Sequence, residues 1–284
     1  VFLFTFLPVV LFLYYLMPEQ LKNILLLLAS LVFYAWGEPV AIFLLLGMLL
    51  FNYAWGLHLA GVLKNRRRAR SGMIFCVAIN LGLLSFFLYG RTVLGWLEAL
   101  LPVKLPFQGF ALPMGMSLCT LQMLSYIIDV YRGNVKVQKN PADLALYVLM
   151  FSKMPGGPIV RYIEMEKQLR ARQISSGKVG EGAMYFIRGL SKKVLFADNI
   201  GLLYDEVMAL EAGQMSVLSA WLGCIAFALK IYYNLSGYTD MAIGLGKMTG
   251  FDFPENFQYP YAAGSTTEFW YKWHMYLGAW FREY

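Results

Sequence analysis

The sequence predicts an all-α protein that crosses a membrane several times. Hydrophobic residues make up 59% of the 284 residues and charged residues only 14%, whereas soluble domains carry about 25% charged residues. The mean hydropathy is +0.54. A large soluble helical protein would need a polar face on every helix, and the stretches Phe2–Met17 and Ile42–Leu50 have none.

Six apolar stretches approach the roughly 20 residues that span the hydrocarbon core of a bilayer. In chain order they are Phe2–Met17, Ile24–Trp36, Val40–Leu63, Met73–Tyr89, Phe110–Ile128 and Met215–Leu229. The first lacks the basic start and small-residue end of a signal peptide, so we interpret it as a membrane segment. With further short or re-entrant pieces, we expect eight or nine membrane segments.

A short basic loop between two of these stretches sets the expected orientation. The chain carries a net charge of +7, and its main cluster of cations is Lys64, Arg66, Arg67, Arg68 and Arg70. Short loops rich in lysine and arginine face the cytoplasm in most membrane proteins. This rule accounts for the positive charge without a nucleic-acid partner, and it predicts an N-terminus on the outside.

We interpret residues 1–284 as one transmembrane domain with two parts. Residues 1–100 are rich in Leu and Phe and predict packing helices with aromatic belts. In residues 105–284, Pro, Gly and charged residues interrupt short apolar runs. Irregular backbone at membrane depth occurs where it is buried in protein or lines a cavity, so this second part is expected to form the site. Within it, the polar stretch from Glu164 to Gly182 predicts a cytoplasmic loop.

The cysteines and histidines do not predict a metal site. Cys76, Cys119 and Cys224 each lie in an apolar stretch and form no C-x-x-C pair, so neither a disulfide nor a zinc framework is indicated. His58 and His274 are the two histidines, and two distant histidines do not supply the several converging ligands that a metal needs.

Two long motifs near the end of the sequence carry a family resemblance. They read NLSGYTDMAIGLGKMTGFDFPENFQYPY and TTEFWYKWHMYLGAWFREY, and LQMLSYIIDVYRG, GGPIVRY and GLSKKVLFADN precede them in the chain. Together they resemble the membrane-bound O-acyltransferase family, and most closely the bacterial branch that contains alginate O-acetyltransferases and D-alanyl transfer proteins. The resemblance runs through essentially the whole chain, in the order of the family.

The resemblance implies an activity, a fold and a location. Such proteins move an acyl group, here expected to be acetyl, from a cytosolic acyl-CoA or acyl-carrier-protein thioester to a hydroxyl group. In the bacterial branch the acceptor is an extracytoplasmic polysaccharide or partner protein. The fold would be a helical bundle around a funnel in the bacterial inner membrane. The thioester is a substrate, membrane lipid is the surrounding partner, and no tightly bound cofactor is implied.

The resemblance also assigns His274 as a catalytic residue. The family segment W-H-x-S/T-L-x-x-W-x-R-[DE]-Y matches this chain from Trp273 to Tyr284, with Tyr276 in place of the small hydroxyl residue. A second family histidine lies downstream in a W-H-G segment that this chain does not contain. We therefore expect the sequence to be a piece of a longer protein, inactive by itself.

The physical surroundings of His274 give a second expectation. From the residues alone, His274 is either an acid–base group near neutral pH or a member of an aromatic belt. If one helix runs through the segment, Trp270 and Leu277 share the face of His274, and Trp273 lies about 100° away. Trp270 and Trp273, which we also assign to substrate binding, are then expected to form an aromatic wall that excludes water from the imidazole.

Asp240 is the next candidate, since ionisable residues at membrane depth are costly and usually functional. It follows Asn234, Ser236 and Tyr238 in the first long motif, and we assign all four to substrate binding. The alternative is that Asp240 caps a helix N-terminus. The family often has Asp-Phe where this chain has Asn234-Leu235.

Three further side chains are assigned to substrate binding. Lys153 and Arg161 flank a Pro/Gly break, and their charges suit the phosphates or carbonyls of an acyl donor; the alternative is an ordinary basic loop. Gln122 lies seven residues before Asp129, on the same helix face. We interpret Asp129 with Arg132 as a structural pair, and the G-x-x-x-G of Gly246 and Gly250 as a helix-packing motif.

Two other classes of protein fit part of this pattern. A transporter would also have broken helices and an intramembrane acid, but it is often built from an internal repeat, and no repeat is evident. A non-catalytic membrane scaffold remains the third alternative. The ordered motifs favour the acyltransferase.

Overall fold

The predicted helical fold class is confirmed by the computed structural model, which describes residues 1–100, 112–154, 156–211 and 213–284. These ranges contain helices and no strand. They form two compact units: the first is Val1–Met154, Arg161–Arg170 and Tyr284, and the second is Pro155–Val160 and Ala171–Glu283. The predicted division into residues 1–100 and 105–284 does not coincide with these units, and its second part starts outside the described residues.

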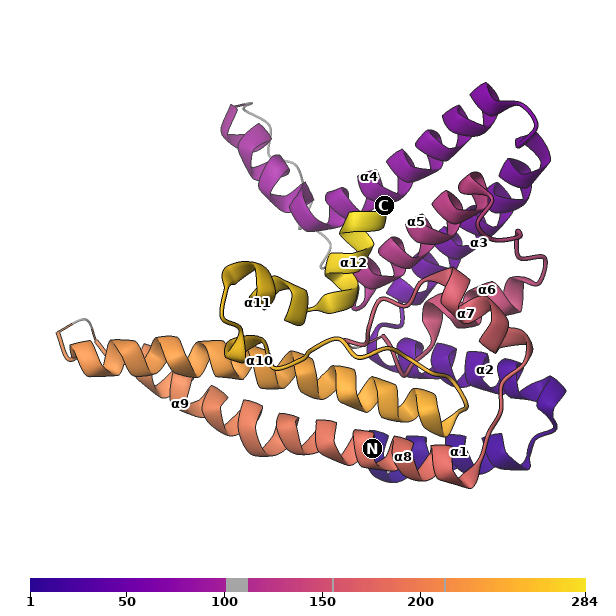
Figure 1. The fold of residues 1–284 in the computed structure, drawn as a ribbon. Helices are drawn as coiled ribbons and strands as arrows, with labels where there is room; N and C mark the ends of the chain where they lie inside the picture. Colours follow the sequence, from indigo (N-terminus) through magenta and orange to yellow (C-terminus); the bar gives the residue numbers. More distant parts are fainter. Residues whose placement is uncertain (101–111, 155, 212) are drawn as a thin grey trace. The chain divides into compact units, whose positions relative to one another are not determined.

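Unit 1 begins with a series of apolar helices (Figure 1). They are η1 (Phe2–Phe6), α1 (Leu7–Leu16), α2 (Glu19–Gly37), α3 (Ala41–Val62) and α4 (Arg66–Leu100). Met17 is extended because a residue before proline avoids helical backbone, so α1 ends there and α2 follows Pro18. The next proline, Pro39, separates α2 from α3.

α5 (Met116–Arg132) is the buried centre of unit 1 and packs against α3, α4, α6 and α7. Left-handed glycines bound it at both ends, Gly115 at φ 72° and Gly133 at φ 78°, a conformation that glycine adopts without steric cost. α6 (Pro141–Leu149) starts at Asn140, whose side chain caps the amide of Ala142. α7 (Tyr162–Arg170) completes the unit.

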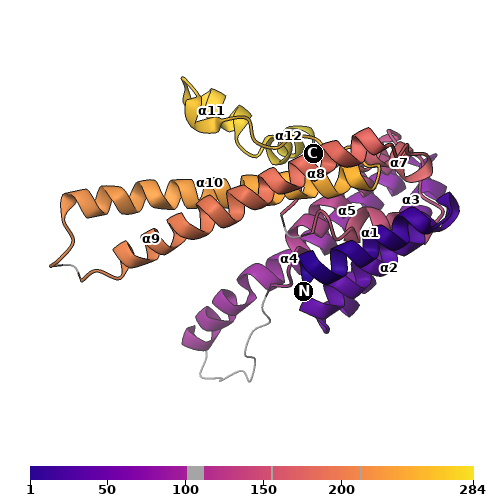
Figure 2. The ribbon, with the colours of Figure 1, turned by 90° about the horizontal axis from the view of Figure 1, so that it is seen from below.

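Unit 2 is built on two long antiparallel rods, which Figures 1 and 2 both show side by side. The first rod is continuous through α8 (Ser176–Ser191), η2 (Lys192–Ala197) and α9 (Asp198–Met208), and the second is α10 (Val217–Met248). The contacts of α10 run along α8, η2 and α9.

Glycine pairs allow α8 and α10 to approach closely. A Cβ added at Gly189 would lie 2.5 Å from the carbonyl oxygen of Gly237, and one at Gly182 would lie 2.6 Å from that of Gly244. Small residues at a helix interface permit such backbone contact. The predicted packing role of Gly246 and Gly250 is wrong: Gly246 faces the ring of Phe253, and Gly250 is a left-handed residue after α10 at φ 86°.

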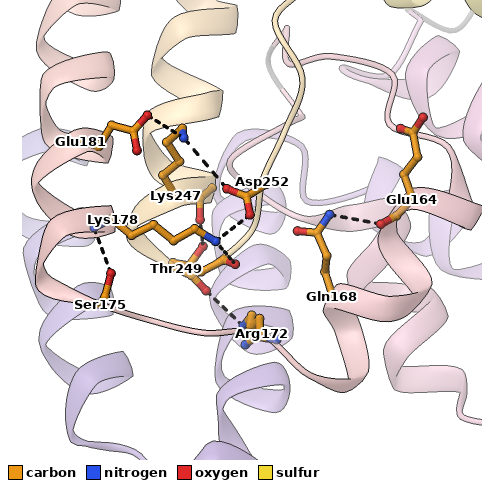
Figure 3. A network of polar contacts seen from close by, with 11 residues as sticks. Glu164, Gln168, Arg172, Ser175, Lys178, Glu181, Lys247, Thr249 and Asp252 are labelled. Carbon is orange, nitrogen blue, oxygen red and sulfur yellow. Dashed lines mark hydrogen bonds and ion pairs between the residues drawn. The ribbon is translucent and has the colours of Figure 1, made fainter.

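A polar network joins the start of α8 to the end of α10 (Figure 3). Lys178 Nζ lies 2.6 Å from Asp252, and Lys247 Nζ lies 2.8 Å from Glu181. Arg172 donates to the carbonyl of Thr249 over 3.1 Å. The stretch from Glu164 to Gly182, predicted as a cytoplasmic loop, is partly helical, since α7 and the first turns of α8 lie there; its location on the cytoplasmic side stays a prediction.

Four helices are long and apolar enough to cross a membrane: Glu19–Gly37, Ala41–Val62, Arg66–Trp96 and Val217–Met248. They contain or overlap four of the six predicted stretches. The first stretch forms the shorter apolar helix Phe2–Leu16. The stretch Phe110–Ile128 starts outside the described residues, and the 17 residues of α5 continue it. The expected total of eight or nine segments stays a prediction.

Candidate functional site

His274 lies at a break between two short helices of unit 2, not within one helix. α11 (Thr266–Lys272) ends at Trp273, whose backbone is extended, and α12 (Met275–Glu283) starts one residue after His274. His274 itself has a left-handed backbone with φ 48°, which is uncommon for a residue other than glycine and costs of order 1 kcal/mol or more. The predicted continuous helix is therefore wrong.

Asn256 holds this break together. Its backbone carbonyl accepts the amide proton of Met275 over 3.0 Å, and its side-chain Oδ1 accepts that of Tyr276 over 3.1 Å. These are amides of the first turn of α12, which have no partner inside the helix. Its side-chain nitrogen Nδ2 lies 3.2 Å from Nδ1 of His274. Asn256 is only 1% exposed.

The contacts of Asn256 fix which nitrogen of His274 carries the proton. Because Oδ1 accepts from a backbone amide, the group that faces the imidazole is the NH2, which can only donate. Nδ1 of His274 therefore accepts, so the proton of the neutral ring lies on Nε2. In this tautomer Nε2 presents a hydrogen-bond donor, and no ring nitrogen is left free to act as a base.

The surroundings of His274 also favour the neutral ring. Desolvation lowers the pKa of His274 from its ordinary value of 6.5, because burial disfavours the charged form. A proton on Nδ1 would in addition meet the NH2 of Asn256. The ring of Phe257 contacts the imidazole of His274, with the two ring centroids 5.4 Å apart. Trp270, predicted to share the face of His274, is 61% exposed.

Trp273 is the centre of an aromatic cluster beside His274. Its ring stacks on Phe269 at 5.5 Å and meets Phe257 edge-on at 5.3 Å. The ring of Tyr232 on α10 lies 6.2 Å from it. Of the two predicted wall residues, Trp273 thus belongs to the packed site, while Trp270 does not.

Asp240 lies in a charged cluster between α10 and the α8–η2 rod. Arg188 donates to both of its carboxylate oxygens, over 3.0 and 3.2 Å, and Lys192 Nζ lies 2.7 Å from Oδ2. The same Lys192 amine donates to Ser236 over 2.7 Å. Asp240 is 7% exposed and lies well inside α10, so the alternative of a helix N-cap is wrong. Two cations to one carboxylate leave this cluster with one net positive charge.

The remaining candidates of the first motif differ in their surroundings. Tyr238 packs against the glycine break: a Cβ on Gly156 would lie 3.2 Å from the Tyr238 Cβ. Neighbouring Thr239 donates to the Gly156 carbonyl over 3.4 Å. Asn234 is half-buried on α10, two residues before Ser236.

The three candidates of unit 1 are buried or half-buried in that unit. Lys153 is fully buried, its amine donates to the carbonyl of Tyr147 over 2.6 Å, and burial lowers its pKa to about 7. It is therefore not a cation of an exposed basic loop. Arg161 is half-buried and donates from Nε to Glu164 over 3.0 Å. Gln122 is fully buried, and neither atom of its amide has a hydrogen-bond partner in the described part of the chain.

The partners of Asp129 differ from the predicted ones. Its carboxylate accepts from the hydroxyl of Tyr284 over 2.7 Å and from the side chain of Asn134 over 3.1 Å. Arg132 lies over the ring of Tyr284, 5.5 Å from its centre. Asp129, Asn134, Arg132 and Tyr284 thus form a small structural cluster in unit 1.

Sequence reasoning missed four residues of the site: Asn256, Tyr232, Arg188 and Lys192. Asn256 and Arg188 had usable signals, since an asparagine in a Pro/Gly/aromatic loop is a typical capping residue and a charge on an apolar helix needs a partner. As to metals, the described residues hold no group of three or more His, Cys, Asp or Glu side chains that could bind an ion.

Comparison with known proteins gives a consistent set of relatives. The chain is 40% identical to the probable alginate O-acetylase AlgI of Pseudomonas aeruginosa, over all of this chain and 55% of that protein. It is 31% identical to a peptidoglycan O-acetyltransferase of Helicobacter pylori, over all of this chain and 59% of that protein. A teichoic acid D-alanyltransferase of Bacillus subtilis is 27% identical over 80% of this chain and 58% of its own length.

These relatives confirm the predicted resemblance. The chain spans between 55% and 59% of the length of the three relatives. No protein-family model matches the chain.

Proposed function

Since the chain is a homologue of bacterial O-acetyltransferases along its whole length, we propose that the protein is a membrane-embedded O-acyltransferase. The acyl group, in the first instance acetyl, comes from a thioester of coenzyme A or of an acyl carrier protein on the cytosolic side. The acceptor is a hydroxyl group of an extracytoplasmic polysaccharide such as alginate, or of a partner protein that carries the acyl group onward.

The reaction needs a donor to the carbonyl oxygen and a base. The acceptor hydroxyl attacks the thioester carbonyl, a C–O bond forms, the C–S bond breaks, and the hydroxyl proton ends on the departing thiol. Negative charge develops on the carbonyl oxygen, and a fixed hydrogen-bond donor at that position is typically worth about 10²–10³ in rate. His274 supplies this donor through Nε2–H, and removal of the hydroxyl proton is the task of another group.

The observation that carries this proposal is the bond between Asn256 and His274 Nδ1, at 3.2 Å. It keeps the imidazole neutral with its proton on Nε2. The left-handed backbone of His274, between α11 and α12, restricts the orientation of the ring. Backbone strain of this kind is often found at functional sites. The aromatic cluster around Trp273 packs beside the imidazole, and less polar surroundings strengthen a hydrogen bond made by Nε2.

The donor side is assigned to the residues around the glycine break. Arg161, half-buried and paired with Glu164, would exchange that partner for a phosphate or carbonyl of the thioester carrier. The buried amine of Lys153, whose pKa is lowered to about 7, is suited to a hydrogen bond with a carbonyl rather than to an ion pair. Arg161→Ala is then expected to weaken use of the donor more than use of the acceptor.

The proposal is tested by acyl transfer in proteoliposomes that hold the protein as its gene encodes it. Labelled acetyl-CoA is supplied on the cytosolic side and alginate on the other, and esterified product is counted. His274→Ala should lower the rate about 10²-fold or more, whereas His274→Asn should retain more activity, because an amide also donates. His58→Ala is the matched control, since His58 lies exposed on α3. Wild-type activity in His274→Ala would refute the proposed role.

A further inference from the structure

A cavity of about 460 Å³ opens in unit 1 where the membrane-length helix α3 ends. Its apolar wall includes Ala60, Leu63 and Val130, from the ends of α3 and α5. Its lining also includes three cations, Lys136, Lys139 and Arg170. None of these residues takes part in the proposed acyl transfer.

The three cations are exposed and largely without acidic partners. Lys136 and Lys139 form no ion pair within the described ranges, which omit residues 101–111, 155 and 212. Arg170 is paired with Glu166 at 2.8 Å, but its side chain is still 61% exposed. The lining thus keeps about two positive charges that no acid of the described chain neutralises.

The backbone that presents Lys136 and Lys139 is held rigidly. The intervening Gln138 is buried. Its backbone N–H donates to the hydroxyl of Tyr126 over 3.1 Å, and its side-chain Nε2 donates to the hydroxyl of Tyr162 over 3.0 Å. The hydroxyl of Tyr53 on α3 donates to the carbonyl of Lys139 over 2.7 Å. The cavity is therefore formed in advance, which lowers the entropic cost of binding a ligand.

The position of the cavity indicates its ligand. The span Ala41–Val62 ends at the cavity, and the exposed basic residues Lys64, Arg66, Arg67, Arg68 and Arg70 follow directly. The end of a span lies at the depth of the lipid headgroups. A ligand at this depth that matches this lining has a phosphate for the cations and a hydrocarbon chain for the apolar wall.

We propose that this cavity is a binding site for one anionic glycerophospholipid. The phosphodiester is held by Lys136, Lys139 and Arg170, and the start of one acyl chain lies on Ala60, Leu63 and Val130. A volume of about 460 Å³ accommodates a headgroup and the first part of a chain, with the rest of the chain in the bilayer. Basic pockets beside membrane helices bind anionic headgroups in the same way.

Lipid binding is measured on the purified protein in nanodiscs of phosphatidylcholine, with phosphatidylglycerol added stepwise and bound lipid counted by native mass spectrometry. The pocket variant is Lys136→Gln, Lys139→Gln, Arg170→Gln. Each cation near the surface contributes about 1 kcal/mol, or roughly fivefold, so the variant should bind the lipid about 100-fold more weakly. The matched control Arg66→Gln, Arg67→Gln, Arg68→Gln removes the same charge beside the cavity and should keep most of the affinity.

A second variant tests the apolar wall without changing the charge. Ala60→Phe fills the cavity and should also abolish the saturable binding, whereas binding through surface charge alone would survive it. Equal phosphatidylglycerol affinity in the wild type and the pocket variant, or in Ala60→Phe, would overturn the proposal. Displacement of the bound phosphatidylglycerol by soluble phosphate or coenzyme A would also overturn it, because the ligand of the cavity would then be a soluble anion.

Discussion

The change Asn256→Asp distinguishes a hydrogen-bond donor from a base at His274. Aspartate has the shape of asparagine, and one of its oxygens can still accept the amide of Tyr276. The second oxygen would then face His274 Nδ1 at about the present 3.2 Å, and it can only accept. Nδ1 must therefore take the proton, and Nε2 of the neutral ring loses it.

The size of the effect follows from this contact. An opposite charge at this distance raises the pKa of a histidine by about 1–3 units, which corresponds to roughly 1.4–4 kcal/mol. Below the raised pKa the ring is a cation and Nε2 still donates. Above it the proton that remains is on Nδ1, so transfer should fall about 10²–10³-fold, the usual loss for one donor to an oxyanion.

The assay is the initial rate of acetyl transfer in proteoliposomes between about pH 6 and pH 9.5, with saturating donor and acceptor. In the wild type, Nε2 keeps its proton as pH rises, so His274 causes no loss of rate. Asn256→Asp should add a new fall in rate with rising pH, near or above neutrality. The control Gln258→Glu adds the same charge on an exposed neighbouring residue and should not produce this fall in rate. If the rate of Asn256→Asp instead rises with pH to the wild-type level, the reasoning is refuted. That profile would mean that His274 acts as a base, because an aspartate at Nδ1 supports a histidine base.

Three other changes test the orientation, the helix pair and the buried amine. The orientation is tested with Asn65→Cys in a Cys224→Ser background, because Cys224 is exposed. The new cysteine should resist an impermeant thiol reagent in intact cells and react after permeabilisation. Labelling from outside would reverse the predicted orientation. Gly189→Ala places a methyl 2.5 Å from a backbone oxygen and should destabilise by about 1–3 kcal/mol in thermal unfolding. Gly180→Ala on the same helix meets open space and should be neutral or stabilising; equal effects would refute the close packing. Lys153 binds fewer protons folded than unfolded between about pH 7 and 10.5, so stability should rise with pH there, and Lys153→Met should abolish this slope; an unchanged slope would contradict it.

The membrane helices could be predicted because hydropathy is a property of the local sequence. Ala41–Val62 and Val217–Met248 are apolar over enough residues to span a bilayer whatever their neighbours are. The glycine contacts could not be predicted in the same way. Gly246 and Gly250 have the expected spacing, but Gly237 and Gly244 face α8, because only the fold decides which side of α10 meets another helix.

The candidate site was found by its motif, and its local geometry was missed. Helical periodicity places Trp270 and Leu277 beside His274 only if the backbone is continuous, and Asn256, 18 residues upstream, stabilises a break instead. Asp240 was found because a charge on an apolar helix is conspicuous, but its partner Arg188 lies 52 residues away on α8. Lys153 resembled an exposed loop cation because proline and glycine follow it, whereas the fold buries it completely.

The protonation state of His274 is the most direct test of the account. The encoded protein is labelled with ¹⁵N-histidine, placed in nanodiscs at pH 7 and studied by solid-state NMR, and the His274 signals are assigned by their loss in His274→Gln. The account predicts a neutral ring with its proton on Nε2 and an unprotonated, hydrogen-bonded Nδ1. A proton on Nδ1, alone or together with one on Nε2, would contradict it.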